Sequence, residues 1–208
     1  SSVNSINVNQ RLKEIRIMYS WKLKQLPEDI TELPDLKSIA VYSCGLRSLP
    51  AKFFLNPSLE EVCVCYNNLD VLPEIPAGSR LRSLVLDINN FSALPQNFSN
   101  LTQLEVLGLK DCRFSTFPKE ILALTNLKSL DVSANNISSQ PANLGNLKKL
   151  EKLFLVKTGV RKLPKSLRHT SLKYVAISDT DLSPTEKKNI IKSLPKGCQV
   201  NWTTALNY

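Results

Sequence analysis

Apolar residues recur along the chain with a fixed period. The pattern is L-x-x-L-x-L-x-x-N-x-L followed by L-P, and one clear copy places Leu127, Leu130, Val132, Asn135 and Ile137 in its key positions. The first residues of the eight copies are Leu12, Leu36, Leu59, Leu81, Leu104, Leu127, Leu150 and Leu172, spaced 22 to 24 residues apart. Such a period is the signature of a repeat architecture in which similar coils stack on one another.

Each copy predicts a short strand followed by an irregular return segment. The fourth and sixth positions are apolar and alternate with polar residues, as on a strand with one buried face. The proline of the L-P pair fixes its own backbone dihedral and donates no hydrogen bond, so it turns the chain onto the opposite side. Apolar residues of the return segment, such as Ile121 and Leu124, complete the coil. Because one coil cannot bury these residues alone, we expect stacked coils with a shared core.

The ninth position of each copy predicts an inward-facing polar residue. An asparagine at this point can bond backbone groups that otherwise lack partners between coils. The eight residues are Ser20, Cys44, Asn67, Asn89, Cys112, Asn135, Thr158 and Thr180, which are all small. We therefore expect Cys44 and Cys112 to be buried small side chains.

The two ends of the repeat array differ. After the last repeat, Ser183, Pro184 and Glu186 form the pattern of a helix N-cap, a first-turn proline and a first-turn acid. The apolar positions of this helix and of a following strand are Ile190, Ile191, Leu194, Cys198, Val200 and Trp202. Before the first repeat only Ile6 and Val8 alternate. We predict one domain over 1–208, with an N-terminal edge at 1–11, eight repeats at 12–182 and a helix–strand cap at 183–208.

The 23-residue repeat and the closing segment LSPTEKKNIIKSLPKGCQVNW resemble bacterial leucine-rich-repeat proteins. The resemblance covers roughly residues 12–202. It implies an α/β solenoid in the form of a horseshoe, with a parallel inner β-sheet, an irregular or 3-10 convex side and a C-terminal helix–strand cap. It also implies a protein that is exported or surface-associated in a host-associated bacterium, such as a spirochaete, and that binds host molecules.

The third, fifth, seventh and eighth positions of each copy project from the predicted sheet and form the candidate binding surface. Neighbouring strands lie about 4.8 Å apart, so eight strands span about 34 Å. We predict a protein-binding patch in the early repeats at Met18, Tyr19, Trp21, Tyr42, Cys63, Cys65, Tyr66, Val85 and Ile88. A smaller patch comprises Phe154, Val156 and Tyr174. An apolar, aromatic patch on a solvated face is typical of an interface, although aromatic residues on adjacent strands also pair to stabilise a sheet.

The second position carries charges that alternate in sign from the third copy onward. Its residues are Lys13, Lys37, Glu60, Arg82, Glu105, Lys128, Glu151 and Lys173. Strands in register place neighbouring copies side by side, so we expect opposite charges to pair across the sheet. The pattern indicates structural support and not a binding site.

The net charge of +9 arises in the C-terminal third. Residues 1–139 contain 14 basic and 14 acidic side chains, whereas residues 140–197 contain 13 basic and 4 acidic ones. An acidic protein or an anionic glycan is therefore an alternative partner. The basic residues fall mainly outside the concave strand positions and do not alternate with stacking aromatics, which disfavours nucleic acid.

The sequence shows no motif for catalysis. Cys63 and Cys65 lack the further ligands of a metal site, and the single histidine, His169, lies on a convex connection. A phosphate loop, a nucleophile elbow and a His-metal motif are all absent. We therefore expect no enzyme, no metal and no cofactor. The first residues lack a targeting signal, and no apolar run has the length of a membrane span.

Two classes of function follow from this pattern. In the first, the protein is a recognition module that binds a partner protein on its concave face, at a host interface if the resemblance holds. In the second, it is a structural component that dimerises through the concave aromatic patch or the N-terminal edge. The sequence leaves the partner, the compartment and the oligomeric state open.

Overall fold

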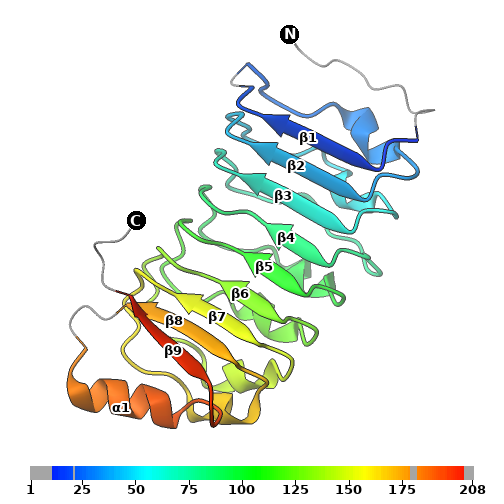
Figure 1. The fold of residues 1–208 in the computed structure, drawn as a ribbon. Helices are drawn as coiled ribbons and strands as arrows, with labels where there is room; N and C mark the ends of the chain where they lie inside the picture. The colour runs from blue at the N-terminus through cyan, green and yellow to red at the C-terminus, as the bar shows by residue number, and fades with distance from the viewer. Residues whose placement is uncertain (1–10, 21, 179–181, 204–208) are drawn as a thin grey trace.

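Nine parallel strands form one sheet in the computed structural model, which describes residues 11–20, 22–178 and 182–203. The strands follow one another in chain order from β1 to β9 (Figure 1). They are β1 (Glu14–Met18), β2 (Ser38–Tyr42), β3 (Glu61–Cys65), β4 (Ser83–Val85), β5 (Val106–Gly108), β6 (Ser129–Asp131), β7 (Lys152–Leu155), β8 (Tyr174–Ser178) and β9 (Gln199–Thr203). From β1 to β8, each residue pairs with one 22 to 24 positions later, so the repeat period sets the register.

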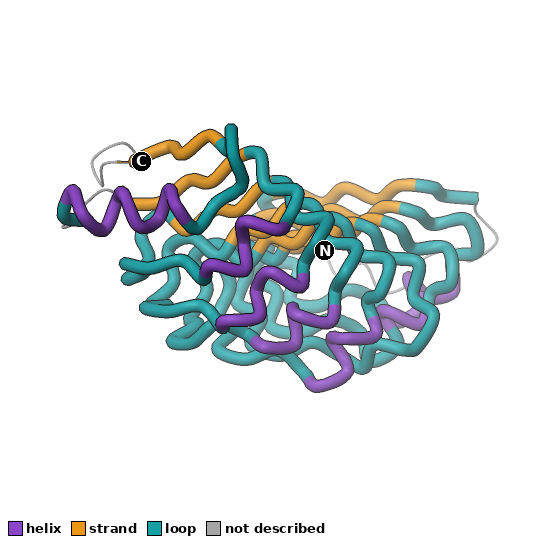
Figure 2. The backbone as a smooth tube through the Cα atoms, turned by 90° about the horizontal axis from the view of Figure 1, so that it is seen from below, coloured by secondary structure: helices purple, strands orange, loops and turns teal. Residues whose placement is uncertain are grey.

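Short 3-10 helices lie on the side opposite the strands (Figure 2). Within the described ranges they are η1 (Glu28–Glu32), η2 (Phe53–Leu55), η3 (Gln96–Asn100), η4 (Lys119–Ala123), η5 (Ala142–Asn146) and η6 (Lys165–His169). A proline immediately precedes five of them, and these residues are Pro27, Pro95, Pro118, Pro141 and Pro164. The predicted solenoid with a parallel inner sheet and a 3-10 convex side is confirmed.

The apolar repeat positions fill the space between the strands and the 3-10 helices. In the sixth repeat Leu127, Leu130, Val132 and Ile137 are all fully buried. Leu144 returns from the convex side and is equally buried. Each fully buried leucine or valine stabilises the fold by about 1.5–3 kcal/mol, and the core they form runs through the stack of coils.

Buried asparagine side chains at the ninth position join three of the coils to the coil that precedes each of them. The Oδ1 atom of Asn67 accepts hydrogen bonds from the backbone N–H groups of Cys44 and Leu46, both at 3.1 Å. Its Nδ2 atom donates to the carbonyl oxygens of Val41 at 3.1 Å and of Cys65 at 2.8 Å. Asn89 and Asn135 make corresponding bonds. The inward orientation predicted for this position is confirmed by these contacts.

Cysteine replaces asparagine at two of the ninth positions. Cys44 is fully buried and Cys112 is 8% exposed, as expected. The Sγ atom of Cys44 donates to the Tyr42 carbonyl oxygen at 3.2 Å, whereas that of Cys112 lies 3.6 Å from the Leu86 carbonyl oxygen. A cysteine thiol at this position therefore makes only some of the hydrogen bonds that an asparagine amide makes there. Thr180 lies outside the described residues.

A second set of asparagines connects the coils near the 3-10 helices and was not predicted from the repeat. The Nδ2 atoms of Asn56, Asn100 and Asn126 donate to the carbonyl oxygens of Leu33, Ile75 and Thr102, at 2.9, 2.9 and 2.8 Å. Each bond joins a residue to the preceding coil. The return segments are thus held at the same spacing as the strands.

A helix and a strand cover the last coil, as predicted. Helix α1 (Pro184–Lys192) begins with a capping box in which Ser183 and Glu186 bond each other's backbone N–H groups. Ile190 of this helix is fully buried, and Trp202 of β9 packs partly buried against the core. Ile191 was expected on the same apolar face but is 54% exposed. Successive residues of a helix point in different directions, and Ile190 is the one that faces the core. Ile6 and Val8, at the other end, lie outside the described residues.

Removing one inward amide should destabilise the stack. Asn135 is 4% exposed and bonds Phe114, Leu109, Val132 and Ser133, so Asn135→Ala leaves several buried backbone groups without partners. We expect the free energy of unfolding in urea to fall by roughly 3 kcal/mol or more.

The exposed neighbour provides the control for this variant. Asn136→Ala should change the free energy of unfolding by less than about 0.5 kcal/mol. Asn135→Cys, which copies the residue at positions 44 and 112, should lie between the two. Equal stability of the two alanine variants would contradict the role assigned to the inward amide.

Candidate functional site

The strand register arranges the outward side chains in columns, each formed by one position of successive repeats. The fifth-position column runs through the middle of the concave face, and from the second to the fifth repeat its members are Ala40, Cys63, Val85 and Gly108. These four residues are small, whereas the column holds Arg16 in the first repeat and Phe154 in the seventh. Larger side chains stand on either side of it in the third, seventh and eighth positions.

Large apolar side chains are exposed at one end of the early repeats. Met18 is 51% exposed, Tyr19 is 71% exposed and Tyr66 is 56% exposed. Tyr42 pairs with Met18 across β1 and β2 and is half-buried. We use the term aromatic patch for Met18, Tyr19, Tyr42, Cys63, Tyr66, Val85 and Ile88, all of which are at least partly exposed. Trp21, the remaining predicted neighbour, lies outside the described residues.

Two predicted site residues are covered. Cys65 is 4% exposed and Val156 is 7% exposed, so the prediction that they contribute to the accessible face is wrong. Both occupy the seventh position, where small side chains such as Ser133 and Ser178 are also buried. Only a long side chain reaches solvent from this column, which the alternation of apolar and polar residues does not reveal.

The eighth-position residues share a left-handed backbone conformation that the sequence did not predict. Their φ angles are 55° at Tyr19, 53° at Ser43, 57° at Tyr66, 58° at Ile88, 50° at Asp111, 54° at Ala134 and 53° at Lys157. A non-glycine residue in this region costs roughly 1–2 kcal/mol, and a β-branched residue is an outlier there. Glycine or asparagine would fit this turn better. Tyrosine and isoleucine at these positions are therefore residues that the turn itself does not favour.

The later patch is an internally paired cluster. The rings of Phe154 and Tyr174 pack with their centroids 5.6 Å apart, and Asn201 donates to the Tyr174 hydroxyl at 2.9 Å. Together with Asp131 and Lys157 they line a cavity of about 260 Å³. The structure thus brings Phe154 and Tyr174 together, and the cavity that they line reaches Ile88 of the aromatic patch.

A largely buried carboxyl group lies between the two patches. Asp87 Oδ1 accepts a hydrogen bond from the Lys110 backbone N–H at 2.9 Å. Gly108 leaves room for this side chain, because a Cβ atom there would lie 2.7 Å from Asp87 Oδ1. Burial raises the pKa of Asp87 to about 6, since the loss of hydration outweighs the hydrogen bond that favours the carboxylate.

The charged side chains of the second-position column form ion pairs from one repeat to the next, along the end of the sheet at which the strands begin. Glu105 bonds Arg82 at 2.8 Å and Lys128 at 2.6 Å, and these contacts lower its pKa. Lys37 pairs with Glu60 at 2.8 Å, and Lys173 with Glu151 at 3.0 Å. Pairing between neighbouring copies is confirmed at these steps. Such exposed pairs contribute at most about 1 kcal/mol each, which is consistent with structural support.

Most of the C-terminal basic residues that flank α1 lie off the concave face. Arg161, Lys162, Lys165, Arg168 and Lys192 line a groove of about 530 Å³ between η6 and α1, which we call the basic groove. Glu186 is the acidic residue among those that line the groove, and its carboxylate accepts hydrogen bonds from the Arg161 guanidinium at 2.9 and 3.0 Å. These bonds lower the pKa of Glu186 to about 2. The groove therefore carries an excess of positive charge.

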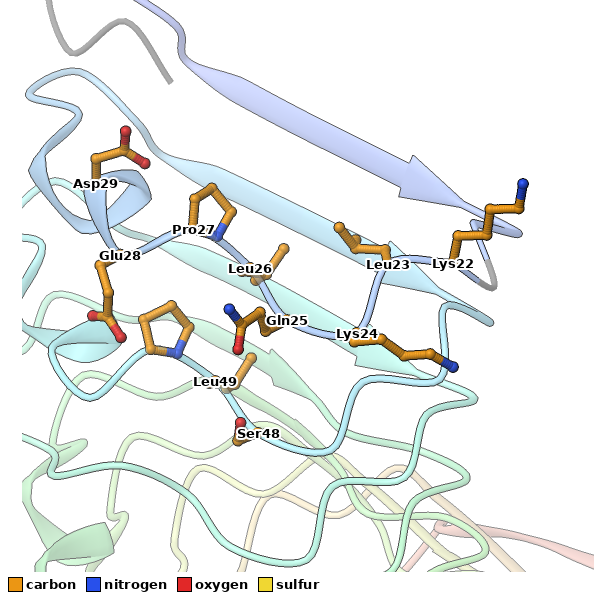
Figure 3. A pocket seen from close by; sticks show the side chains of 11 residues that line it. Lys22, Leu23, Lys24, Gln25, Leu26, Pro27, Glu28, Asp29, Ser48 and Leu49 are labelled. Atoms are coloured by element: carbon orange, nitrogen blue, oxygen red, sulfur yellow. The ribbon is translucent and has the colours of Figure 1, made fainter. Parts of the chain in front are cut away.

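A hollow of about 650 Å³ lies between the return segments of the first two repeats (Figure 3). Leu23, Leu26 and Leu49 border it, but each is less than 8% exposed and already packs in the core. Figure 3 shows Lys22 and Lys24 extending away from these leucines. The hollow thus presents backbone and the ends of charged side chains, and we assign it no binding role.

Within the described ranges, no group of three or more histidine, cysteine, aspartate or glutamate side chains is placed to hold a metal ion. In the same part of the chain, no helix combines the length and apolar character that crossing a membrane requires.

A sequence profile for a leucine-rich repeat region matches residues 58–201, which is more than half of the chain. The protein therefore belongs to the leucine-rich-repeat family. The repeat period, the parallel sheet and the buried ninth position all agree with this assignment.

Solved bacterial proteins share the fold. An internalin from Listeria monocytogenes superposes with a TM-score of 0.61 at 14% identity, covering 89% of this chain and 57% of its own. The leucine-rich repeat domain of the type III effector XopL gives 0.60 at 21% identity, covering 92% and 69%. A leucine-rich-repeat protein from Leptospira interrogans gives 0.50 at 22% identity, covering 86% and 59%. The chain spans less than two thirds of the Listeria and Leptospira proteins, and these identities establish the fold alone.

The raised pKa of Asp87 predicts a dependence of stability on pH. Because the folded pKa of about 6 exceeds the ordinary value of 3.8, the contribution of this group is fully present below about pH 4 and is lost as the pH rises through 6. Asp87→Asn should therefore gain about 2 kcal/mol in free energy of unfolding relative to wild type between pH 4 and pH 7. Urea unfolding at the two pH values measures this difference.

The exposed Asp70 supplies the control for this experiment. The pH dependence of Asp70→Asn should run parallel to that of wild type. If the free energy of unfolding of Asp87→Asn also runs parallel to that of wild type between the two pH values, then Asp87 is solvated in the folded protein. That result would contradict its raised pKa.

Proposed function

We propose that this protein is a recognition module that binds a partner protein through the aromatic patch on its concave face. Leucine-rich-repeat proteins commonly mediate recognition between proteins. The observation that carries the proposal is the exposure of Met18, Tyr19 and Tyr66 together at one end of the face. An exposed apolar cluster of this kind is typical of an interface, and tyrosine is enriched among residues that dominate binding energy.

Ring contacts favour binding over sheet stabilisation as the role of this patch. Within the described residues, rings pair between Phe53 and Phe54 and between Phe154 and Tyr174. The described tyrosines of the aromatic patch take part in neither pair. The later cluster therefore satisfies the sheet-stabilising explanation, whereas the early tyrosines offer their faces to solvent.

The left-handed eighth position gives independent support. Tyr66 and Ile88 adopt a conformation that costs free energy. Burial of the Tyr66 side chain offsets little of this cost, because the side chain is 56% exposed. The conformation itself recurs in all seven described repeats and belongs to the coil, but the turn does not select tyrosine or isoleucine. A partner contact accounts for large side chains at a turn that would favour glycine or asparagine.

The family also informs the class of activity. Leucine-rich-repeat proteins are typically non-catalytic binding modules. We propose that this chain likewise performs no reaction on its partner. The similarity to an internalin and to a type III effector domain supports a partner at the interface between a bacterium and its host, and hence an exported or surface location.

The basic groove supports a second candidate function, binding of an acidic partner. Five basic side chains against one carboxylate make it the most positive of the described hollows. Its position beside η6 and α1 separates it from the aromatic patch. The two candidates therefore predict different sensitive residues.

Self-assembly through the aromatic patch or the N-terminal edge is a third possibility that the same measurements address. Strand β1 is an edge of the sheet within the described residues, because it pairs with β2 alone. A stable dimer in light scattering that is lost in Tyr66→Ala would replace a foreign partner with a second copy of this chain.

Tyrosine removal should weaken binding more than charge reversal does. Truncating a buried interface aromatic costs a few kcal/mol, whereas an exposed lysine pair contributes at most about 1 kcal/mol. For a partner captured from host extract and then purified, Tyr42→Ala combined with Tyr66→Ala should raise Kd about tenfold or more. The free energy of unfolding should fall by no more than about 2 kcal/mol, because Tyr66 is mostly exposed and Tyr42 is half-buried.

Lys162→Glu combined with Lys165→Glu is the matched comparison. This variant should mainly slow association and change its salt dependence. If charge reversal abolishes binding while the tyrosine variant binds normally, the basic groove is the site and the acidic-partner function replaces the first proposal.

A further inference from the structure

Two thiols and a phenol meet in the middle of the early concave face. Cys63 and Cys65 are two residues apart on β3, so both side chains project from the same side of the strand. Their Sγ atoms lie 2.9 Å apart, and both cysteines are free thiols. Tyr42 stands opposite Cys65 on β2, and its hydroxyl bonds Cys63. Cys63 thus has a hydrogen-bonding partner on two sides, Cys65 on its own strand and Tyr42 on β2.

The arrangement stabilises the ionised form of Cys63. The hydrogen bond with Cys65 and then that with Tyr42 lower the pKa of Cys63 to about 7, against the opposing effect of burial. The same contacts raise the pKa of Cys65, and that of Tyr42 to about 12, so both donors keep their protons. Asp87 acts in the opposite direction, because its negative charge disfavours a thiolate nearby.

A cavity gives reagents access to this sulfur atom. Cys63 is partly exposed and lines a space of about 320 Å³ together with Met18, Ala40 and Tyr42. Ala40 and Val85 flank Cys63 across the sheet and are small enough to leave the space open. Glu14, Arg16 and Glu61 stand around its border, and Arg16 pairs with Glu14.

The other four cysteines lack this combination. Cys44, Cys65 and Cys112 are at most 8% exposed, and burial raises the pKa of Cys112 to about 12. Cys198 is partly exposed, but burial also raises its pKa. Reactive cysteines are accessible and have a stabilised thiolate, which only Cys63 of the five provides.

We propose that Cys63 is a modification site at which a low-molecular-weight disulfide forms a mixed disulfide with the protein. The Cys63 thiolate, whose proton has passed to water, attacks one sulfur of the disulfide. A bond forms between Cys63 Sγ and that sulfur, the original S–S bond breaks, and the other half leaves as a thiolate that takes a proton from water. Cys65 and Tyr42 position the attacking sulfur, and the added group occupies the cavity. This inference does not depend on the proposed function.

The test uses the full chain and 2-hydroxyethyl disulfide, an uncharged probe on which the surrounding Glu14, Arg16 and Glu61 exert no net charge effect. Intact mass spectrometry should show one adduct at pH 7 that a reductant removes, and peptide mapping should locate it at Cys63. The reaction rate should reach half its maximum near pH 7. Cys63→Ser should abolish the adduct, and Cys198→Ser should leave it unchanged.

Variants of the two donors separate a positioning role from mere accessibility. Cys65→Ala should slow the reaction several-fold at pH 7 and move its pH profile upward, whereas Cys65→Ser, which still donates a hydrogen bond, should restore it. Tyr42→Phe should shift the profile in the same direction as Cys65→Ala. An adduct at Cys198, no adduct in the folded protein, or pH profiles that ignore these substitutions would overturn the proposal.

Discussion

The hydrogen bonds of the inward ninth position are the constraint on which the rest of the structure depends. At the end of each strand the chain turns, and backbone groups there have no partner within their own coil. Leaving one of them buried and unpaired would cost about 1–3 kcal/mol. Asn67, Asn89 and Asn135 each accept from and donate to the neighbouring coil and also donate to a carbonyl of their own coil, so these bonds favour one spacing and one register.

That register converts a linear repeat into a surface with distinct columns. The second position ties neighbouring coils with ion pairs, and the fourth and sixth positions fill the core. From the second to the fifth repeat the fifth position contributes small residues to the middle of the concave face, whereas the eighth position presents Tyr19 and Tyr66. Because the core is filled from other positions, the outward columns are available for recognition, and we propose that the exposed tyrosines there contact a partner.

The repeat period was enough to predict stacked coils with one strand each and the buried Cys44 and Cys112. The resemblance to leucine-rich-repeat proteins supplied the parallel sheet and the 3-10 side, and the N-cap pattern at Ser183 predicted the capping helix. Periodicity assigns a residue to a face, and that assignment was sufficient wherever the face decides burial. It failed for Cys65 and Val156, because burial in the seventh column depends on side-chain length. The left-handed eighth position recurs in every described repeat, but no glycine or asparagine stands there to reveal it in the sequence. The raised pKa of Asp87 depends on burial and on neighbours 20 or more residues away, which a single repeat unit does not encode.

The central claim is that the eighth position keeps large side chains for contact with a partner and not for folding. The most direct measurement compares unfolding free energy and partner affinity in Ile88→Asn, with Ala134→Asn, at the same left-handed position of a later repeat, as the control. Asparagine adopts this conformation readily, so both variants should keep or gain up to about 1 kcal/mol of stability. Only Ile88→Asn should lose affinity. A loss of stability in Ile88→Asn with affinity unchanged would show that Ile88 serves the fold, and would contradict the account.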